Sequence, residues 1–358
     1  MSPDRAGGIR HRARIKPPAV NFSTPFSPLA QPPAPFQLKD LGAHAAARGF
    51  ADGDTDQAQI VLETVGFQHA SSYFDLFKDD TGAIPQGSSM KELHRALIFD
   101  RKFQALLLEY IGLFELKFRA QYSYHMSIHR GAFAHRNPKN FKDEAHFKKF
   151  LATYQGEFRR QLAKNNMELQ TAYTTYGDAP IWLAVEIMSF GTLSKLFNNT
   201  KSKAARKGVS AAFRATPEEL TSWIHALTDV RNTCAHFGRL CGTKLTTQPK
   251  RVPGIKGDNA RPFYIVPLLV YLLGDGTLFP DEPELSYDLA LVRDAMQLLD
   301  DYDDILDRCG LPADWEQLVF NRSLVDIDSS PAVDFLSRPR SGRVWLTAHS
   351  DDGAVRIG

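Results

Sequence analysis

Large apolar side chains repeat at helical spacing along residues 90–128. They recur every three or four positions, at Phe103, Leu107, Tyr110, Ile111, Phe114 and Phe118. Side chains with this spacing lie on one face of an α-helix, and such a face has to be buried against other elements. The repeat therefore predicts one helix that is long enough to organise the fold.

Shorter helices are predicted on both sides of this long helix, separated by breaks that contain Gly, Pro or Asn. They cover residues 37–48, 55–65, 144–165 and 181–197, a segment beginning at 216, an apolar segment ending at 273, and residues 286–309. Between them we expect an aromatic connector at 67–78, a lysine-bearing linker at 201–207 and a loop at 246–261. Convincing period-two strands are missing, so the predicted fold class is all-α.

A proline-rich, basic segment precedes the predicted helices. Residues 1–36 contain eight prolines and an excess of basic over acidic side chains, with few large apolar groups to offset the entropy of ordering. We expect residues 1–36 to form a disordered arm, residues 37–322 to form one helical domain, and residues 323–358 to form a loose C-terminal tail.

The composition limits the class of protein. A hydrophobic fraction of 43% is sufficient for a substantial core. The longest apolar run, residues 263–273, is too short to span a bilayer and contains Pro267, so no membrane helix is expected. A formal net charge of +2 gives no overall basic field, and any nucleic-acid binding has to use local patches.

The N-terminus and the cysteines indicate a cytoplasmic protein. No apolar stretch follows the basic N-terminal residues, so this segment does not resemble a secretion signal. Cys234, Cys241 and Cys309 form neither a disulfide framework nor a paired metal motif, in agreement with a reducing compartment. Cys234 falls on the apolar face of a predicted helix, and we interpret it as a core residue rather than a nucleophile.

The helix that begins after Thr216 has the clearest start signal in the chain. Thr216 is a good N-cap, Pro217 suits the first helical position, and Glu219 completes a capping box. The residues that follow divide into two faces. The apolar face holds Leu220, Trp223, Leu227, Val230 and Cys234, and the polar face holds His225, Thr228, Asn232, His236 and Arg239.

Arg231 and His236 form an R-x4-H pair in this segment. A bare pair of this kind is expected about once by chance in a chain of this size. A second pair, Arg130 and His135, lies between Gly and Pro breaks with no capped helix behind it, and we interpret it as chance. On periodicity alone, Arg231 and His236 fit an ordinary solvated helix face equally well.

Four blocks of sequence, taken together, are more specific than the pair. They lie at residues 66–80, 99–119, 182–194 and 231–240. Their patterns are an aromatic GF–YF–FKDD series, FDRK followed by E-x3-R, W-x3-E-x2-SFG-x-LS, and RNTCAHFGRL. In this order the blocks resemble the Abi-like, abortive-infection branch of the HEPN superfamily over about residues 37–320. The likeness departs from the family pattern at Phe237 and at Cys241-Gly242.

The resemblance implies a HEPN-like helical bundle with additional N- and C-terminal helices, and a metal-free endoribonuclease site. It makes Arg231 and His236 the catalytic residues, and it places Asn232, Arg239, Glu115 and Arg119 as supporting residues. In the implied reaction the 2'-OH of RNA attacks the adjacent phosphate and leaves 2',3'-cyclic phosphate and 5'-OH ends. Imidazole exchanges protons near neutral pH, and a guanidinium group can hold the phosphate.

The resemblance also implies partners. Residues five apart on a helix are separated by about 140° around its axis, so one helix alone forms a poor site. We expect a two-fold homodimer that brings two Arg231 and His236 sets into one cleft. We further expect an RNA substrate and a protein or RNA antitoxin. We expect no cofactor, no metal and no membrane association.

Other readings of the same residues stay open. The protein could be a non-catalytic RNA-binding module or a structural dimerisation module. Glu115 and Arg119, one helical turn apart, fit a structural ion pair as well as a catalytic-support role. The basic stretch formed by Lys201, Lys203, Arg206 and Lys207 could bind RNA phosphates or be a solvated linker. The aspartates of residues 300–307 fit the outer face of a helix better than a cation site.

Overall fold

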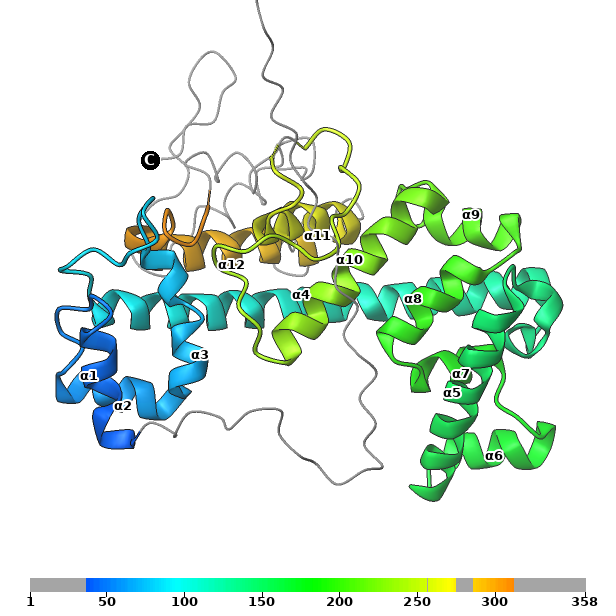
Figure 1. Ribbon diagram of the computed structural model, residues 1–358. Helices are drawn as coiled ribbons and strands as arrows, with labels where there is room; N and C mark the ends of the chain where they lie inside the picture. Colours follow the sequence, from blue (N-terminus) through cyan, green and yellow to red (C-terminus); the bar gives the residue numbers. More distant parts are fainter. Residues whose placement is uncertain (1–36, 256, 275–285, 312–358) are drawn as a thin grey trace, which may run out of the picture.

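The computed structural model describes residues 37–255, 257–274 and 286–311 (Figure 1). Within these ranges the chain forms α-helices and 3-10 helices, two isolated bridges, and no strand. The all-α prediction is confirmed. The predicted arm at residues 1–36 and the predicted tail at residues 323–358 lie outside the described residues.

Helix α4, Met90–Arg130, runs through the middle of the molecule, and several later helices pack against it (Figure 1). It begins after Ser89, whose hydroxyl accepts the N–H of Lys91 at 3.0 Å, and it ends at Gly131, which adopts a φ of 88°. The predicted helix is therefore confirmed and is slightly longer than expected. Since its apolar side chains face several neighbours at once, α4 organises the fold.

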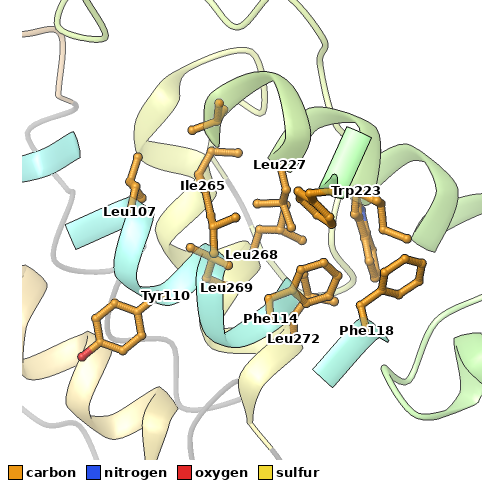
Figure 2. Packing of buried hydrophobic residues seen from close by; sticks show 14 of the residues in the cluster. Leu107, Tyr110, Phe114, Phe118, Trp223, Leu227, Ile265, Leu268, Leu269 and Leu272 are labelled. Carbon is orange, nitrogen blue, oxygen red and sulfur yellow. The ribbon is translucent and has the colours of Figure 1, made fainter. Parts of the chain in front are cut away.

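The main core lies where α4 meets two later helices, α10 (Pro217–Ala235) and α11 (Ile265–Leu273) (Figure 2). Phe114 and Phe118 of α4 face Trp223 and Leu227 of α10 in this core, and all four side chains are buried. Complete burial of each such side chain contributes about 2–3 kcal/mol relative to exposure in water. The packing thus holds α10, which carries Arg231, firmly against α4.

The N-terminal helices form a second apolar cluster at the start of α4. The elements are η1 (Leu38–Asp40), α1 (Leu41–Ala46), α2 (Asp56–Val65), α3 (Phe67–Ser71) and η2 (Phe74–Phe77). Phe50, Tyr73, Phe74 and Phe77 are buried in this cluster with Met90, Leu93 and Leu97. The expected aromatic connector is packed as predicted, but most of it is helical, because buried backbone needs internal hydrogen bonds.

Residues 181–197 do not form the single helix that periodicity predicts. They divide into α7 (Ile181–Ala184), η5 (Val185–Ile187) and α8 (Phe190–Asn199). The break comes at Ser189, which has extended backbone and whose hydroxyl accepts the N–H of Thr192 at 3.2 Å. An N-cap serine of this kind starts a new helix, and the apolar repeat alone hides the interruption.

The predicted linker at residues 201–207 is also wrong in part. Ser202 caps helix α9 (Lys203–Ala211), and its hydroxyl accepts the N–H of Ala205 at 3.3 Å. Ala205 and Val209 are buried, so this helix is held by a narrow apolar stripe beneath an exposed basic face. Helix α5 (Glu144–Ala163) agrees with its prediction, whereas α6 (Met167–Tyr176) was not predicted.

Helix α10 confirms the predicted start. Thr216 and Glu219 form the complete capping box, with the hydroxyl of Thr216 accepting the N–H of Glu219 at 3.2 Å. The five residues of the predicted apolar face are buried. Thr228, which was placed on the polar face, is buried too, and its hydroxyl donates to the carbonyl of Ile224 at 2.8 Å. This backbone bond satisfies the hydroxyl and allows it to lie in the core.

The C-terminal helices cover another side of α4 (Figure 1). They are η6 (Pro262–Tyr264), α11, α12 (Tyr287–Asp301) and η8 (Asp303–Ile305). The predicted helix at 286–309 is therefore shorter than expected, because Tyr302 leaves helical geometry with a φ of −130°. Among the helices of the described residues, none is long and apolar enough to cross a membrane.

Candidate functional site

A cavity of about 400 Å³ brings together side chains from distant parts of the sequence. Its lining includes Glu115 and Arg119 of α4, Arg160 of α5, Glu186 of η5 and Arg231 of α10. Four of these residues come from the sequence blocks on which the catalytic prediction rests. The fold therefore brings Arg231 to the same cavity as the predicted supporting pair of α4.

Glu115 and Arg119 form an ion pair inside this cavity, one turn apart on α4. Their side chains are only 16% and 10% exposed. Arg119 also donates to the carbonyl oxygens of Val185 and, at 2.8 Å, of Met188. These bonds satisfy backbone carbonyls at the start of η5 and directly after it, so Arg119 fixes the position of η5 against α4.

Arg231 is in a different state from the other arginines of the cavity. Arg119 is held by Glu115, and Arg160 makes a bidentate contact with Glu157 at 2.6 and 2.7 Å. Arg231 is exposed and makes no ion pair among the described residues; its Nη1 only approaches Oδ1 of Asn232 at 3.5 Å. Its guanidinium group is therefore free to bind an anion that enters the cavity.

His236 lies directly after α10 rather than within it. The helix ends at Ala235, and the N–H of His236 donates to the carbonyl of Asn232 at 3.0 Å, which preserves the expected i, i+4 relation. The His236 side chain is exposed and does not line the cavity of Arg231. One protein chain thus presents the two predicted catalytic groups at neighbouring positions without enclosing both in one cavity.

A tight turn follows His236 because Phe237 adopts a left-handed backbone with a φ of 58°. The N–H of Gly238 donates to Thr233 at 2.8 Å and that of Phe237 to Cys234 at 3.1 Å, which is the Schellman arrangement of a helix end. Phe237 is exposed, and the guanidinium carbon of Arg101 lies 4.2 Å from the centre of its ring. This geometry fixes where the chain leaves the helix beside His236.

The loop after this turn is anchored by Asp100, which belongs to the FDRK block but was given no role by the sequence reasoning. The buried carboxylate of Asp100 accepts the N–H groups of Leu240 at 3.0 Å and Cys241 at 3.1 Å, and the hydroxyl of Tyr73 at 2.6 Å. Nε2 of Gln104 donates to the same carboxylate at 3.1 Å. The sequence signal that could have identified this role is an acidic residue on the apolar face of the long helix, since a buried carboxylate needs hydrogen-bond donors.

Burial and the Asp100 carboxylate raise the pKa of two neighbouring groups. The pKa of the Tyr73 hydroxyl lies well above its ordinary value, first because the group is buried and then because Asp100 is negative. The same two causes raise the pKa of the Cys234 thiol to about 12. Cys234 therefore stays a protonated core residue near neutral pH, as predicted, rather than a nucleophile.

Arg239 does not belong to the cavity of Arg231. Its Nη2 lies 4.0 Å from Oδ2 of Asp75, and its guanidinium carbon lies 5.8 Å from the ring centre of Tyr73. Arg239 therefore contacts the N-terminal helices instead of Arg231 or His236. Its proposed supporting role can only act through the position of the loop.

The basic stretch of residues 201–207 divides into two kinds of side chain. Lys201, Lys203 and Lys207 are exposed. Arg206 is half-buried, and its Nη2 donates to the carbonyl of Pro217 at 3.3 Å and to the hydroxyl of Thr221 at 3.1 Å. None of these four residues lines the cavity of Arg231. Arg206 joins α9 to α10, and only the three lysines present free charge to solvent.

The second R-x4-H pair does not form a site. Arg130 is exposed at the end of α4, whereas His135 is completely buried and its ring nitrogens have no hydrogen-bond partner within the described ranges. The aspartates near the end of α12 are largely exposed while Leu298, Leu299, Ile305 and Leu306 are buried, as predicted. No group of three potential metal-ligating side chains occurs in the part of the chain that the structure describes.

The fold and the cavity define an all-α protein in which a free arginine on one core helix faces an ion pair on another. The family of Abi-like proteins matches residues 60–241, slightly more than half of the chain. The chain therefore belongs to the Abi-like protein family. The matched range contains Arg231, His236 and the residues of the cavity. Comparisons with curated proteins and with solved structures found no match.

Proposed function

We propose that this Abi-like protein is a metal-independent endoribonuclease of the HEPN type that acts in abortive-infection defence against phage. The observation that carries the proposal is the guanidinium group of Arg231, which makes no ion pair among the described residues, in a cavity that also holds the Glu115 and Arg119 pair. A free cation in a concave site fits a phosphate group. Membership of the Abi-like family supports the defence role.

The chemistry needs one base, one acid and one cation. A base removes the proton of a ribose 2'-OH while O2' forms a bond with the adjacent phosphorus. The bond from phosphorus to the O5' of the next nucleotide then breaks, and this oxygen takes up a proton. His236 can act as the base or the acid, and Arg231 stabilises the charge that develops on the phosphate oxygens. DNA lacks the attacking hydroxyl and is not a substrate.

A two-fold pairing of α10 completes the proposed site. Within one chain His236 lies outside the cavity of Arg231, on the exposed end of the same helix. A second copy related by two-fold symmetry adds another Arg231 and another His236 to a shared cleft. Two histidines then serve as base and acid, and Asn232 orients the imidazole or the ribose.

An active ribonuclease of this kind requires restraint in the cell. Unrestrained cleavage of cellular RNA would harm the host, so we propose that a protein or RNA antitoxin holds the enzyme inactive until infection. In this scheme the protein is the toxin, and its release stops growth of the infected cell.

The experiment that tests the proposal measures cleavage of single-stranded RNA by the purified protein in EDTA. The expected products carry 2',3'-cyclic phosphate and 5'-OH ends. Arg231→Ala and His236→Ala should each abolish cleavage, whereas Arg130→Ala and His225→Ala, which change exposed residues elsewhere, should not. Cleavage that requires Mg²⁺ contradicts the mechanism, and binding of RNA without cleavage makes the protein a non-catalytic RNA-binding module.

A further inference from the structure

A second cavity, of about 450 Å³, opens between the first half of α5 and the end of α8. Its lining includes three lysines, Lys142, Lys149 and Lys195, together with His146 and one carboxylate, Asp143. These residues stand outside the blocks on which the catalytic prediction rests. We call this space the lysine cavity.

The lysine cavity adjoins the cavity of Arg231. Thr153 of α5 and Thr192 of α8 line both of them. Along α5 the lining residues follow helical spacing, from Lys149 through Thr153 to Arg160, so they share one face of the helix. At 1.5 Å per residue, this face extends about 16 Å from Lys149 to Arg160. The two cavities therefore lie side by side along this face, which is longer than a single nucleotide.

The free charge in the lysine cavity is positive. The ammonium groups of Lys149 and Lys195 are exposed and form no ion pair among the described residues. Oδ1 of Asp143 accepts the N–H of His146 at 2.7 Å and lies 3.4 Å from Nδ1 of the same residue, so this one carboxylate caps α5 while three ammonium groups line the cavity. Nζ of Lys142 donates to the carbonyl of Asn198 at 2.9 Å. Burial, and then the nearby charge of Arg206, lower the pKa of Lys142.

Lys148, the residue before Lys149 on α5, differs from it because its ammonium group forms an ion pair. Nζ of Lys148 lies 2.8 Å from the carboxylate of Glu144, outside the cavity. Lys149, its neighbour, lines the cavity and has no such partner in the part of the chain that the structure describes. An extended anion is therefore attracted to the cavity rather than to the neighbouring face that carries Lys148.

We infer that the lysine cavity binds the phosphates of an RNA strand next to the bond that is cut beside Arg231. This inference rests on the proposed function and adds the path that the substrate follows. Unpaired ammonium groups attract a phosphate backbone without reading its sequence, so this path favours long single strands over dinucleotides. The hydroxyls of Thr153 and Thr192 lie where the strand passes from one cavity to the other.

The test compares two RNA lengths and two double variants. Lys149→Ala/Lys195→Ala removes the unpaired charges, and Lys148→Ala/Lys91→Ala removes two exposed lysines outside the cavity as a matched control. In the His236→Ala background, the first pair should weaken binding of a fluorescent single-stranded RNA at least about 10-fold, and should lower the salt-dependence slope by about 1.4. The control pair should change neither quantity.

Cleavage by otherwise wild-type protein supplies the second measurement. The Lys149→Ala/Lys195→Ala change should reduce cleavage of the long RNA and leave cleavage of the dinucleotide UpA unchanged. If the wild type cuts RNA and the variant cuts the long RNA equally well, the path is wrong and the ribonuclease stands. If the wild type neither cuts nor binds RNA, the proposed function fails as well. Binding of polyglutamate, but not RNA, through these two lysines would indicate an acidic protein partner and overturn the inference.

Discussion

The carboxylate of Asp100 on α4 accepts the backbone N–H of Leu240 at 3.0 Å, although the two residues lie 140 positions apart in the chain. The same carboxylate accepts the hydroxyl of Tyr73 in the N-terminal helices. Asp100 thus connects three segments, one of which begins immediately after His236. The position of the turn beside the proposed catalytic histidine depends on this buried charge.

Replacement of Asp100 by Asn should therefore weaken both the fold and the proposed activity. An amide group presents N–H donors where the carboxylate accepts the N–H groups of Leu240 and Cys241, and one of these donors is left unsatisfied in the core. Such a loss costs about 3 kcal/mol of unfolding free energy. Urea denaturation measures this change, and the exposed Glu109→Gln on the same helix should leave stability within about 0.5 kcal/mol of wild type. Equal stability of the two variants would contradict the anchoring role.

Arg119→Met should lower the free energy of unfolding by about 3–5 kcal/mol. The change removes the buried guanidinium group and leaves the half-buried Glu115 carboxylate and the carbonyls of Val185 and Met188 without their donor. Thermal or urea denaturation measures the loss, with the exposed Arg159→Met on α5 as the control. A small effect on stability together with complete loss of RNA cleavage would instead assign Arg119 a direct part in the reaction.

The folded protein should lose stability in acid through His135. Burial lowers the pKa of His135 from its ordinary 6.5 to about 4. The contribution of this neutral imidazole is present in full above pH 6.5 and is lost as the pH falls toward 4, because the unfolded chain takes up the proton first. At pH 4.5 the loss amounts to about 2.5 kcal/mol.

The measurement for His135 is the unfolding free energy at pH 7 and at pH 4.5, for wild type and for His135→Phe. Phenylalanine keeps an aromatic ring beside Tyr154, whose ring centre lies 5.0 Å from that of His135, and it cannot be protonated. The variant should lose less stability than the wild type between the two pH values. Parallel losses in both proteins would place the acid sensitivity elsewhere.

Arg231→Lys should keep RNA binding but reduce the rate of cleavage by about 100-fold. Lysine retains the positive charge, yet it lacks the planar fork that contacts two phosphate oxygens at once. Binding is measured in the His236→Ala background, and single-turnover cleavage with otherwise wild-type protein. Arg231 is exposed and carries no structural ion pair among the described residues, so its replacement should leave the unfolding free energy unchanged. Cleavage at the wild-type rate would show that Arg231 contributes only its positive charge and not a two-point contact with the phosphate.

Local sequence patterns predicted the long helix, the capped start of α10 and the all-α class, because caps and apolar repeats act within a few residues. They were wrong at Ser189 and Ser202, where N-caps begin α8 and α9 inside a segment that periodicity had treated as a continuous helix or a linker. The prediction that Thr228 lies on the polar face was also wrong. A hydroxyl that donates to a carbonyl of its own helix can be buried at little cost in free energy.

The sequence alone identified the two residues of the R-x4-H pair. The order of the four sequence blocks alone indicated the resemblance to the Abi-like family. Only the tertiary structure decided that Arg231 shares a cavity with Glu115 and Arg119, that Arg239 turns toward Asp75, and that a row of lysines adjoins this cavity. Contacts of this kind join residues separated by tens to hundreds of positions. They depend on how helix faces pack, which no local repeat encodes.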